Sequence, residues 1–259
     1  MPYKKCPACN SEKIIDTGKP ILQGVDSKYN VIQCTECKIM WSSPMPTKEE
    51  LDEHYEKYYY VRNSTVDKNK FKKRLIEIIS FRNFRKNFFL DSIEKYLKVK
   101  KVIDYGCGND NLLIIAKGRG WEVTGIDYSD EEKSFYEKEN IKFIKASTLD
   151  EAGLEESSLG CIILKHTIEH ITEIKSYLNS IRKYLSEDGI LAIKTPSSSS
   201  LRARLNLTQW HIVNPPEHQW GFNKNNFRIL LENNGFNVLD IKDSMIINEL
   251  TCIAGKSKN

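Results

Sequence analysis

The chain has 259 residues, of which 40% are hydrophobic and 29% charged, and its formal net charge is +4. This length suits one medium-sized domain with a small accessory part, and the composition is that of a soluble globular protein. No apolar run is long enough to cross a bilayer and the first residues lack the apolar core of a signal peptide, so we expect a cytoplasmic protein without a membrane span. The excess of positive charge is too small to indicate nucleic-acid binding by itself.

Four of the seven cysteines form two pairs, Cys6-x-x-Cys9 and Cys34-x-x-Cys37. In a cytosolic chain such pairs indicate a metal site before disulfides. Four thiolates complete a tetrahedral zinc site with no open position, so the zinc would be structural. We therefore predict a zinc ribbon over residues 1–45, with strands near 13–17 and 28–33. A redox or fortuitous pairing is the alternative.

Residues 46–98 are predicted to form a helical linker or lid. A proline-punctuated segment over 40–46 leaves the ribbon, and Thr47 with Glu50 three residues later has the pattern of a capping box that opens a helix. Residues 67–98 have the apolar spacing of an amphipathic helix with a basic face. That face could bind polyanions, but a solvated helix surface explains it more simply.

Residues 101–128 have the order strand, tight turn, helix, strand and acid. A short apolar run ends at Asp104 before a glycine turn, and an apolar helical stretch follows at 112–116. A second strand over 122–126 ends in Asp127. This order is typical of the first βαβ unit of a nucleotide-binding sheet. Asp127, about 20 residues past the turn, is placed to accept hydrogen bonds from ribose hydroxyls.

The turn indicates which nucleotide fits. Gly106 and Gly108 let the backbone pass close to a ligand where a side chain would collide. A dinucleotide site has the pattern Gly-x-Gly-x-x-Gly, whereas this turn has an acid, Asp104, two residues before its first glycine. A carboxylate there would repel a pyrophosphate and could organise contacts to a cationic ligand. A doubly wound domain for another nucleotide is the alternative.

The rest of the chain alternates helices and strands, as expected of a doubly wound α/β sheet. We predict helices at 130–139, 174–185 and 223–233, and strands at 141–146, 159–164, 190–195, 236–241 and 246–254. Gly235 would end the last helix. The strand at 159–164 runs into a polar segment, residues 165–170, at the carboxyl end of the sheet, where such folds bind ligands.

The run Asp104-Tyr105-Gly106-Cys107-Gly108 resembles the first motif of class I S-adenosylmethionine-dependent methyltransferases, Asp-x-Gly-Cys-Gly-x-Gly, with Asp110 in place of the third glycine. The resemblance implies S-adenosylmethionine as cofactor and a seven-stranded α/β sheet whose last strand is antiparallel. The residues that it implies for cofactor binding lie in the turn and after the strands: Asp104, Gly106, Cys107, Gly108, Asp127, Tyr128, Ser147, Thr148 and Lys165. Ser147 or Thr148 stands where these enzymes often have an acid near the adenine amino group.

Further segments are similar to one branch of this class, which carries an N-terminal zinc ribbon and is often associated with modification of sugars and surface polysaccharides. They are the segment from Cys34 to Pro46, His166-x-x-Glu169-His170, Asp188-Gly189, Thr195-Pro196, Glu217-His218 and Gly235-Phe236. The resemblance covers nearly the whole chain and implies a methyltransferase domain over residues 99–259. Its motifs specify the cofactor well and the acceptor poorly.

An insert over residues 197–222 follows the fifth strand, a position that in this fold lies over the transferred methyl group and helps to form the acceptor pocket. Imidazoles suit deprotonation of a hydroxyl because their pKa lies near neutrality. We predict His218 as the general base, with His166 or His170 as alternatives. Glu169 and Glu217 would orient the imidazoles or bind sugar hydroxyls. Packing and capping roles are the alternative for these residues.

These observations lead to the hypothesis of a methyltransferase that acts on a small molecule, most simply a hydroxyl of a sugar or nucleotide sugar. Carbon methylation of a nucleotide sugar is a close variant. An RNA acceptor is a rival, because zinc ribbons and basic helices also occur on RNA enzymes. A non-enzymatic binding module, in which Asp110 marks a decayed site, is a second rival.

Overall fold

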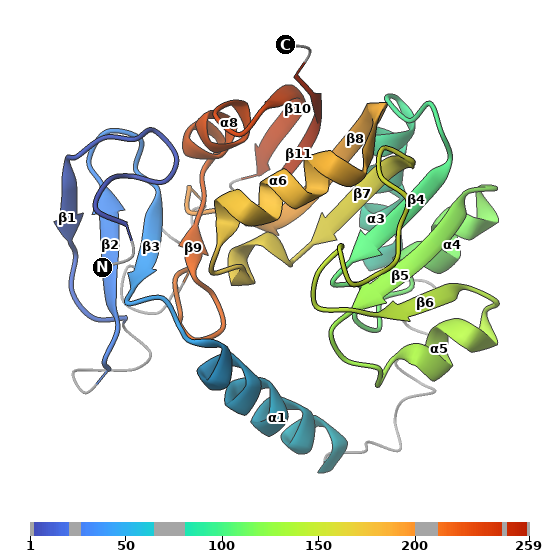
Figure 1. Ribbon diagram of the computed structural model, residues 1–259, viewed down its shortest axis with the longest axis horizontal. Helices are drawn as coiled ribbons and strands as arrows, with labels where there is room; N and C mark the ends of the chain where they lie inside the picture. The colour runs from blue at the N-terminus through green and yellow to red at the C-terminus, as the bar shows by residue number, and fades with distance from the viewer. Residues whose placement is uncertain (1–2, 21–26, 65–80, 200–211, 245–247, 258–259) are drawn as a thin grey trace.

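The computed structural model describes residues 3–20, 27–64, 81–199, 212–244 and 248–257. Its largest element is a seven-stranded sheet in the order β10-β11-β8-β7-β4-β5-β6 (Figure 1). The strands are β4 (Lys101–Tyr105), β5 (Glu122–Asp127), β6 (Lys142–Lys145), β7 (Leu159–Lys165), β8 (Leu185–Pro196), β10 (Phe236–Ser244) and β11 (Glu249–Lys256). The pairs among β4 to β8 are parallel, and β11 is antiparallel to both of its neighbours. The predicted seven-stranded α/β sheet with an antiparallel last strand is confirmed.

The strand order reverses at β4, and this reversal indicates where a ligand would bind. The chain runs outward from β4 to β5 and β6, and then returns to β7 and β8 on the other side of β4. Connections therefore leave β4 and β7 in opposite directions, and ligands of open α/β sheets bind beside the carboxyl ends of strands at such a point. Asp104, Asp127 and Lys165 all lie at this carboxyl edge of the sheet.

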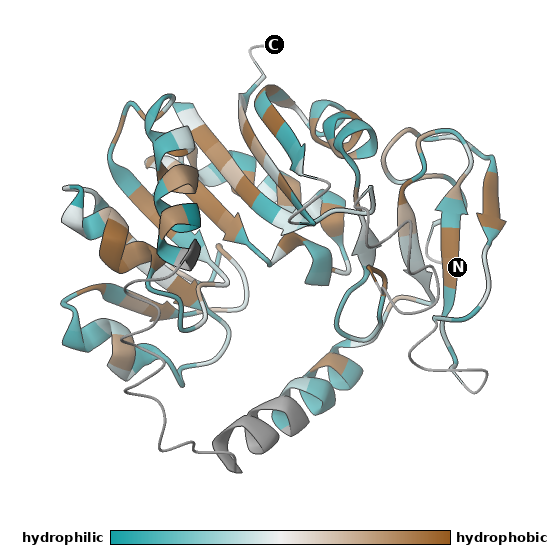
Figure 2. Ribbon diagram, turned by 180° about the vertical axis from the view of Figure 1, so that it is seen from behind, coloured by the Kyte–Doolittle hydropathy of each residue, from teal (hydrophilic) through white to brown (hydrophobic). Residues whose placement is uncertain are grey.

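The central strand β7 is buried on both faces, as its continuous apolar run predicts. Ile162 and Leu164 pack in one cluster with α6 (Ile174–Tyr184) and α8 (Lys224–Glu232). Cys161 and Ile163 pack in another with α3 (Phe81–Glu94), α4 (Leu112–Gly118) and α5 (Lys133–Lys138). Figure 2 shows hydrophobic residues along the strands of the large sheet. Each fully buried aliphatic side chain contributes about 1.5–3 kcal/mol, so this sheet is the core of the molecule.

The boundary between the predicted helix 174–185 and the strand after it differs in the structure. The helix ends at Tyr184, and β8 begins at Leu185, so it includes the Asp188-Gly189 segment. Leu159 pairs with Leu185 and Cys161 pairs with Ile190, so β8 carries extra residues between two neighbouring pairs. The Asp-Gly segment is thus accommodated as an irregularity within the strand, which a local turn signal does not reveal.

The linker contains the predicted capping box. The Thr47 N–H donates to Glu50 Oε2 at 2.9 Å, and the Glu50 N–H donates to Thr47 Oγ1 at 3.3 Å, at the start of α1 (Lys48–Ser64). Of the helix predicted over 67–98, residues 65–80 lie outside the described residues, and the described part, α3, ends at Glu94. Nowhere in the described ranges does a helix combine the length and hydrophobicity needed to span a bilayer.

A second sheet of four strands, in the order β1-β2-β3-β9, stands beside the large one (Figure 1). It contains β1 (Ile14–Asp16), β2 (Asn30–Cys34), β3 (Met40–Ser43) and β9 (Trp220–Gly221). The strands predicted near 13–17 and 28–33 are confirmed. The segment predicted as an exit from the ribbon instead contains β3. This strand pairs with β2 on one side and, on the other, with β9, from the insert over residues 197–222.

Candidate active site and cysteine cluster

The glycine turn follows β4 and packs closely against Thr167 at Gly106. Asp104 is buried, and burial raises its pKa to about 7. Its Oδ1 atom has no hydrogen-bond partner among the described residues. Gly106 has φ +81°, and a Cβ there would lie 2.7 Å from the Thr167 side chain. Buried polar atoms are normally paired, so the unpaired Asp104 oxygen indicates a place for a ligand. At Gly108 an added Cβ would meet no atom within 4 Å, so the backbone is open there.

Asp127, at the end of β5, lies directly across from the turn. Its Oδ2 accepts the Gly108 N–H at 3.0 Å, and its Oδ1 accepts the Ser129 N–H at 3.3 Å. Burial raises its pKa, and these backbone donors oppose that effect. Cys107, between the two glycines, is buried, and its burial raises the pKa of its thiol. Its side chain is therefore an apolar filler of the turn and not a thiolate.

The loop residues predicted beside the cofactor lie at the same carboxyl edge. Ser147 and Thr148 follow β6, and both of their N–H groups donate to Glu151 Oε2, at 2.9 and 3.3 Å. The Tyr128 ring lies 5.2 Å from the ring of Tyr55 on α1. The linker helix therefore contacts the edge of the sheet beside Asp127.

Asp110, the departure from the glycine motif, lies between two lysines. Its carboxylate is 2.8 Å from Lys86 Nζ and 2.7 Å from Lys165 Nζ. Its Oδ1 also accepts the Leu112 N–H at 2.9 Å, at the start of α4. Burial alone would raise the pKa of Asp110, but the two ammonium groups outweigh it and the pKa is lowered. Lys165, predicted to bind the cofactor, is thus held beside the turn by Asp110.

The predicted catalytic residues converge from two separate segments. Glu169 and His170 lie on the short helix η2 (Ile168–His170) after β7, and His218 comes from the insert. One carboxylate oxygen of Glu169 and one ring nitrogen from each of the two histidines all lie within 4.8 Å of one another. We call them the histidine cluster. Groups at this spacing influence one another's charge, and a proton can pass between them through one bridging water.

Hydrogen bonds orient this cluster. His170 Nδ1 lies 2.8 Å from the Glu217 main-chain oxygen. Because a carbonyl oxygen only accepts, Nδ1 carries the hydrogen and the Nε2 of a neutral ring keeps its lone pair. Glu169 Oε2 accepts the Thr195 hydroxyl at 2.9 Å. Glu217, predicted to act through its side chain, takes part through its backbone.

The histidines differ in electrostatics. Burial lowers the pKa of His218, and the nearby His170 lowers it further, so the neutral imidazole is favoured. Burial also acts to lower the pKa of His166, but Glu169 and Glu249 outweigh it and the pKa is raised. A base must be neutral before it accepts a proton, which makes His218 better suited than His166.

One further buried carboxylate, Glu249, was not anticipated from the sequence. It pairs with Arg85 Nη2 and Lys194 Nζ, each at 2.8 Å, and its Oε1 lies 3.7 Å from His166 Nε2. Burial opposes its ionisation, but these partners outweigh burial and lower the pKa to about 2. No local motif marks Glu249, because its partners lie on α3, on β8 and directly after β7.

The four predicted zinc ligands form one compact group. Cys6 Sγ lies 3.5 Å from Cys37 Sγ, and Cys9 Sγ lies 3.6 Å from Cys34 Sγ. Four sulfurs at about 2.3 Å from a tetrahedral zinc are about 3.8 Å apart, so the donor set fits that ion. The hydrogen bond from Cys37 is the largest cause that lowers the pKa of Cys6, to about 5, which favours a thiolate.

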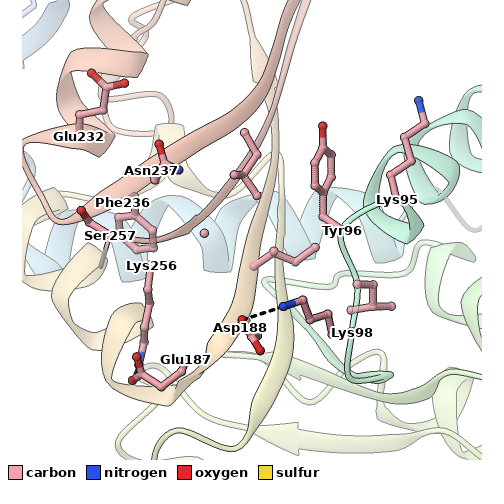
Figure 3. A pocket seen from close by; sticks show the side chains of 15 residues that line it. Lys95, Tyr96, Lys98, Glu187, Asp188, Glu232, Phe236, Asn237, Lys256 and Ser257 are labelled. Carbon is pink, nitrogen blue, oxygen red and sulfur yellow. Dashed lines mark hydrogen bonds and ion pairs between the residues drawn. The ribbon is translucent and has the colours of Figure 1, made fainter. Parts of the chain in front are cut away.

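A groove of about 700 Å³ lies elsewhere, between the end of α3 and the starts of β8 and β10 (Figure 3). Its lining includes Tyr96, Phe236 and the ion pair between Lys98 and Asp188, whose N–O distance is 2.9 Å. These residues lie at the end of the sheet opposite the carboxyl edge. No residue predicted for the site lines this groove, so it is separate from the candidate active site.

Comparison with known proteins identifies the family. Residues 81–241, more than half of the chain, match a family described as "Methyltransferase domain". The chain belongs to this family. It is 31% identical over 117 residues to a ubiquinone biosynthesis O-methyltransferase of Pelagibacter ubique (strain HTCC1062), covering 44% of this chain and 49% of that protein. A protein of the same name from Rickettsia akari (strain Hartford) is 29% identical over 108 residues, covering 39% of this chain and 42% of that protein. The matches thus span half or less of the relatives' length.

Solved structures share the fold at low identity. A Burkholderia thailandensis 1,6-didemethyltoxoflavin-N1-methyltransferase with bound 1,6-didemethyltoxoflavin and S-adenosylhomocysteine has a TM-score of 0.55 and 16% identity, covering 90% of this chain and 98% of its own. A SAM-dependent methyltransferase from Archaeoglobus fulgidus has a TM-score of 0.53 and 18% identity, covering 72% of this chain and 100% of its own. The fold of this chain is therefore that of methyltransferases.

Proposed function

We propose that this protein transfers the methyl group of S-adenosylmethionine to an oxygen of a small acceptor, and that the acceptor is a sugar or nucleotide sugar. The observation that carries the proposal is the meeting of two sets of residues at one edge of the sheet. One set is the glycine turn with Asp104 and Asp127, and the other is the histidine cluster. Membership of the family and the name of the two O-methyltransferase relatives support the reaction class.

The cofactor part of the proposal depends on charge and space. S-adenosylmethionine, when bound, supplies an electrophilic methyl group on a sulfonium and also carries a cationic amino group. The buried Asp104 has an unpaired oxygen that suits such a cation, and Asp127 suits ribose hydroxyls. Because burial raises the Asp104 pKa to about 7, a cationic ligand should bind more weakly below that pH, where the carboxyl is protonated, and should release a proton on binding.

The acceptor part depends on His218. A neutral imidazole can take the proton of an acceptor hydroxyl as the oxygen attacks the methyl group. The buried Glu169 carboxylate then stabilises the positive charge that His218 gains. The remaining contribution of the protein is to hold oxygen and methyl in line.

The cysteine cluster is proposed to hold one structural zinc ion through Cys6, Cys9, Cys34 and Cys37. A sheet this small has too little core to fold without such a metal. Zinc would supply folding energy there and no chemistry, because four thiolates leave no open position.

The first experiment is calorimetric titration of the purified protein with S-adenosylmethionine and, separately, with NAD, in two buffers of different ionisation enthalpy. We expect micromolar binding of S-adenosylmethionine alone, with proton release below about pH 7. Binding of neither ligand would favour the non-enzymatic rival, and binding of NAD would overturn the argument from Asp104.

The second experiment identifies the acceptor with S-adenosylmethionine that carries a ¹³C-methyl group. Nucleotide sugars, simple sugars, a phenol and total RNA are supplied in turn, and the ¹³C shift of the product distinguishes O-, N- and C-methylation. We expect an O-methyl signal with a sugar or nucleotide sugar and its loss in His218→Ala, while cofactor affinity persists. A C-methyl signal, a product only with RNA, or full turnover by His218→Ala would each refute the corresponding part of the proposal.

A further inference from the structure

One buried side chain, Gln219, ties the turn that carries His218 to the cysteine module, by which we mean the described residues of 3–43. Gln219 and Ser42, on β3, are both fully buried. The Ser42 hydroxyl donates to Gln219 Oε1 at 2.8 Å, and the Ser42 N–H donates to the Gln219 main-chain oxygen at 3.0 Å. Two segments far apart in the sequence are therefore joined through both backbone and side chain.

The same residue also reaches the histidine cluster. The Gln219 N–H donates to the main-chain oxygen of Glu169 at 2.7 Å, and its side-chain amide donates to the Pro216 carbonyl. His218 and Asn214 exchange backbone hydrogen bonds of 3.0 and 2.9 Å, which close the turn around Pro216. Gln219 is thus the point at which the turn, η2 and the cysteine module meet.

The strand that follows continues this attachment. In β9, Trp220 pairs with Trp41 and Gly221 pairs with Met40 of β3. The Trp220 indole N–H donates to the main-chain oxygen of Ile171, directly after η2. Since β3 also pairs with β2, which ends at Cys34, an unbroken set of strand pairs leads from the cysteine cluster to His218.

We propose that Ser42 and Gln219 are the positioning residues of His218, so that the cysteine module sets the geometry of the active site without contributing an atom to it. The proposal rests on the proposed function, in which His218 removes the acceptor proton. Removal of the Ser42 hydroxyl would leave the Gln219 amide oxygen buried and unsatisfied, which is unfavourable. A shift of the turn would relieve this, and His218 would move with the turn.

A displaced turn has a measurable signature at His218. The titratable groups that face its ring are Glu169 and His170 from η2, the adjacent Glu217, and His166 at the end of β7. Burial is the largest cause of its lowered pKa, followed by His170. If the turn loosens, water reaches the imidazole and the His170 ring is no longer held against it, so the pKa of His218 should rise toward its ordinary value.

The test uses full-length, metal-loaded protein and the variant Ser42→Ala, with Thr17→Val as matched control. Each change deletes one hydroxyl, but the Thr17 hydroxyl donates at 2.7 Å to the Val31 main-chain oxygen, within the module. The chain has five histidines, so ¹⁵N-histidine labelling gives few NMR signals, and His218→Gln assigns the relevant one. Binding of S-adenosylmethionine and bound zinc, measured in each variant, report that the protein is folded.

We expect Ser42→Ala to raise the His218 pKa and to lower kcat about tenfold, which corresponds to about 1.4 kcal/mol, with an unchanged KM for S-adenosylmethionine. Gln219→Met should do the same, and the double variant should be less impaired than the sum of the two, because both changes break one contact. Chelation of the metal from the wild-type protein should raise the His218 pKa in the same way while cofactor binding persists. Thr17→Val should match wild type.

The outcomes separate this proposal from the proposed function. A His218 pKa that stays at the wild-type value in Ser42→Ala and Gln219→Met would overturn the positioning role, whatever the turnover. A raised pKa in these variants, in a wild-type protein that transfers no methyl group, would overturn the proposed function and support the positioning role.

Discussion

Replacement of Asp110 by glycine would restore the third glycine of the nucleotide-binding motif, yet we expect it to damage the protein. The Asp110 carboxylate pairs with Lys86 and Lys165 and accepts the Leu112 N–H. Without it, two ammonium groups would lose the carboxylate that lies between them, and Leu112, at the start of α4, would lose a hydrogen-bond acceptor. The glycine motif alone predicts a neutral or beneficial change, whereas the contacts of the Asp110 carboxylate predict a harmful one.

The magnitude follows from the burial of the three side chains, which are 17%, 23% and 19% exposed for Lys86, Asp110 and Lys165. Hydrogen bonds to charged groups contribute about 1.5–3 kcal/mol each, and an ordinary hydrogen bond such as that from the Leu112 N–H contributes about 1 kcal/mol. Because the pairs keep some contact with water, the lower values apply. We expect Asp110→Gly to lower the free energy of unfolding by about 3–4 kcal/mol and to weaken S-adenosylmethionine binding.

The assay is urea unfolding followed by circular dichroism, with calorimetric titration of the cofactor. Asp110→Asn, which keeps the size and removes the charge, should lose most of the same stability. Adding Lys86→Met to Asp110→Gly should recover part of the loss, because only one ammonium group then remains unpaired. If Asp110→Gly is as stable as wild type and binds the cofactor equally well, the two ion pairs contribute nothing and the reasoning is refuted.

Other parts of the structure give three further predictions. Gly106→Ala should weaken S-adenosylmethionine binding at least about tenfold in calorimetry. The residue has φ +81°, and an added Cβ would lie 2.7 Å from the Thr167 side chain, so the turn would have to shift. Unchanged affinity would contradict this prediction. The Glu249 pKa is lowered to about 2 from 4.5, so its ion pairs stabilise the fold above about pH 4.5 and this contribution is lost as pH falls toward 2. Glu249→Gln should therefore lower the free energy of unfolding, measured with urea, by about 3 kcal/mol at pH 6 and by little near pH 2. An equal loss at both pH values would be inconsistent with the ion pairs. Cys34→Ser should lose bound zinc and shift the tryptophan fluorescence to the red. The reason is that Trp41 and Trp220 are buried where the cysteine module meets the insert. An unshifted spectrum after metal loss would show that the module folds without the metal.

The large sheet could be predicted because its signals are local. Its central strand is a continuous apolar run, and Asp104 and Asp127 follow strands at positions that the chain order alone relates. The four-stranded sheet could be predicted only in part. The strand β9 has only two residues, which is too short to show a hydrophobic periodicity. The strand β3 contains polar residues that are buried, and it pairs with another strand on each side. Such burial depends on partners about 180 residues away, which no local pattern contains.

The candidate site shows the same limit for charged residues. Arg85 and Lys86 are consecutive on α3, in a stretch whose basic face is most simply interpreted as solvated. In the structure Lys86 pairs with Asp110, and Arg85 pairs with Glu249. Each of these carboxylates also pairs with a lysine of the sheet, Lys165 on β7 and Lys194 on β8 respectively.

Two neighbouring residues of one helix are thus attached to two neighbouring strands through the same arrangement of a buried carboxylate between two cations. A single ion pair of this kind can break by rotation of one side chain, but two in succession fix both the position and the rotation of the helix about its axis. The lysine at the end of β7 lies beside the glycine turn, and the glutamate on β11 contacts the histidine after β7. The placement of α3 is therefore coupled both to the glycine turn and to the segment after β7. A change that breaks either arrangement should affect cofactor binding and catalysis together.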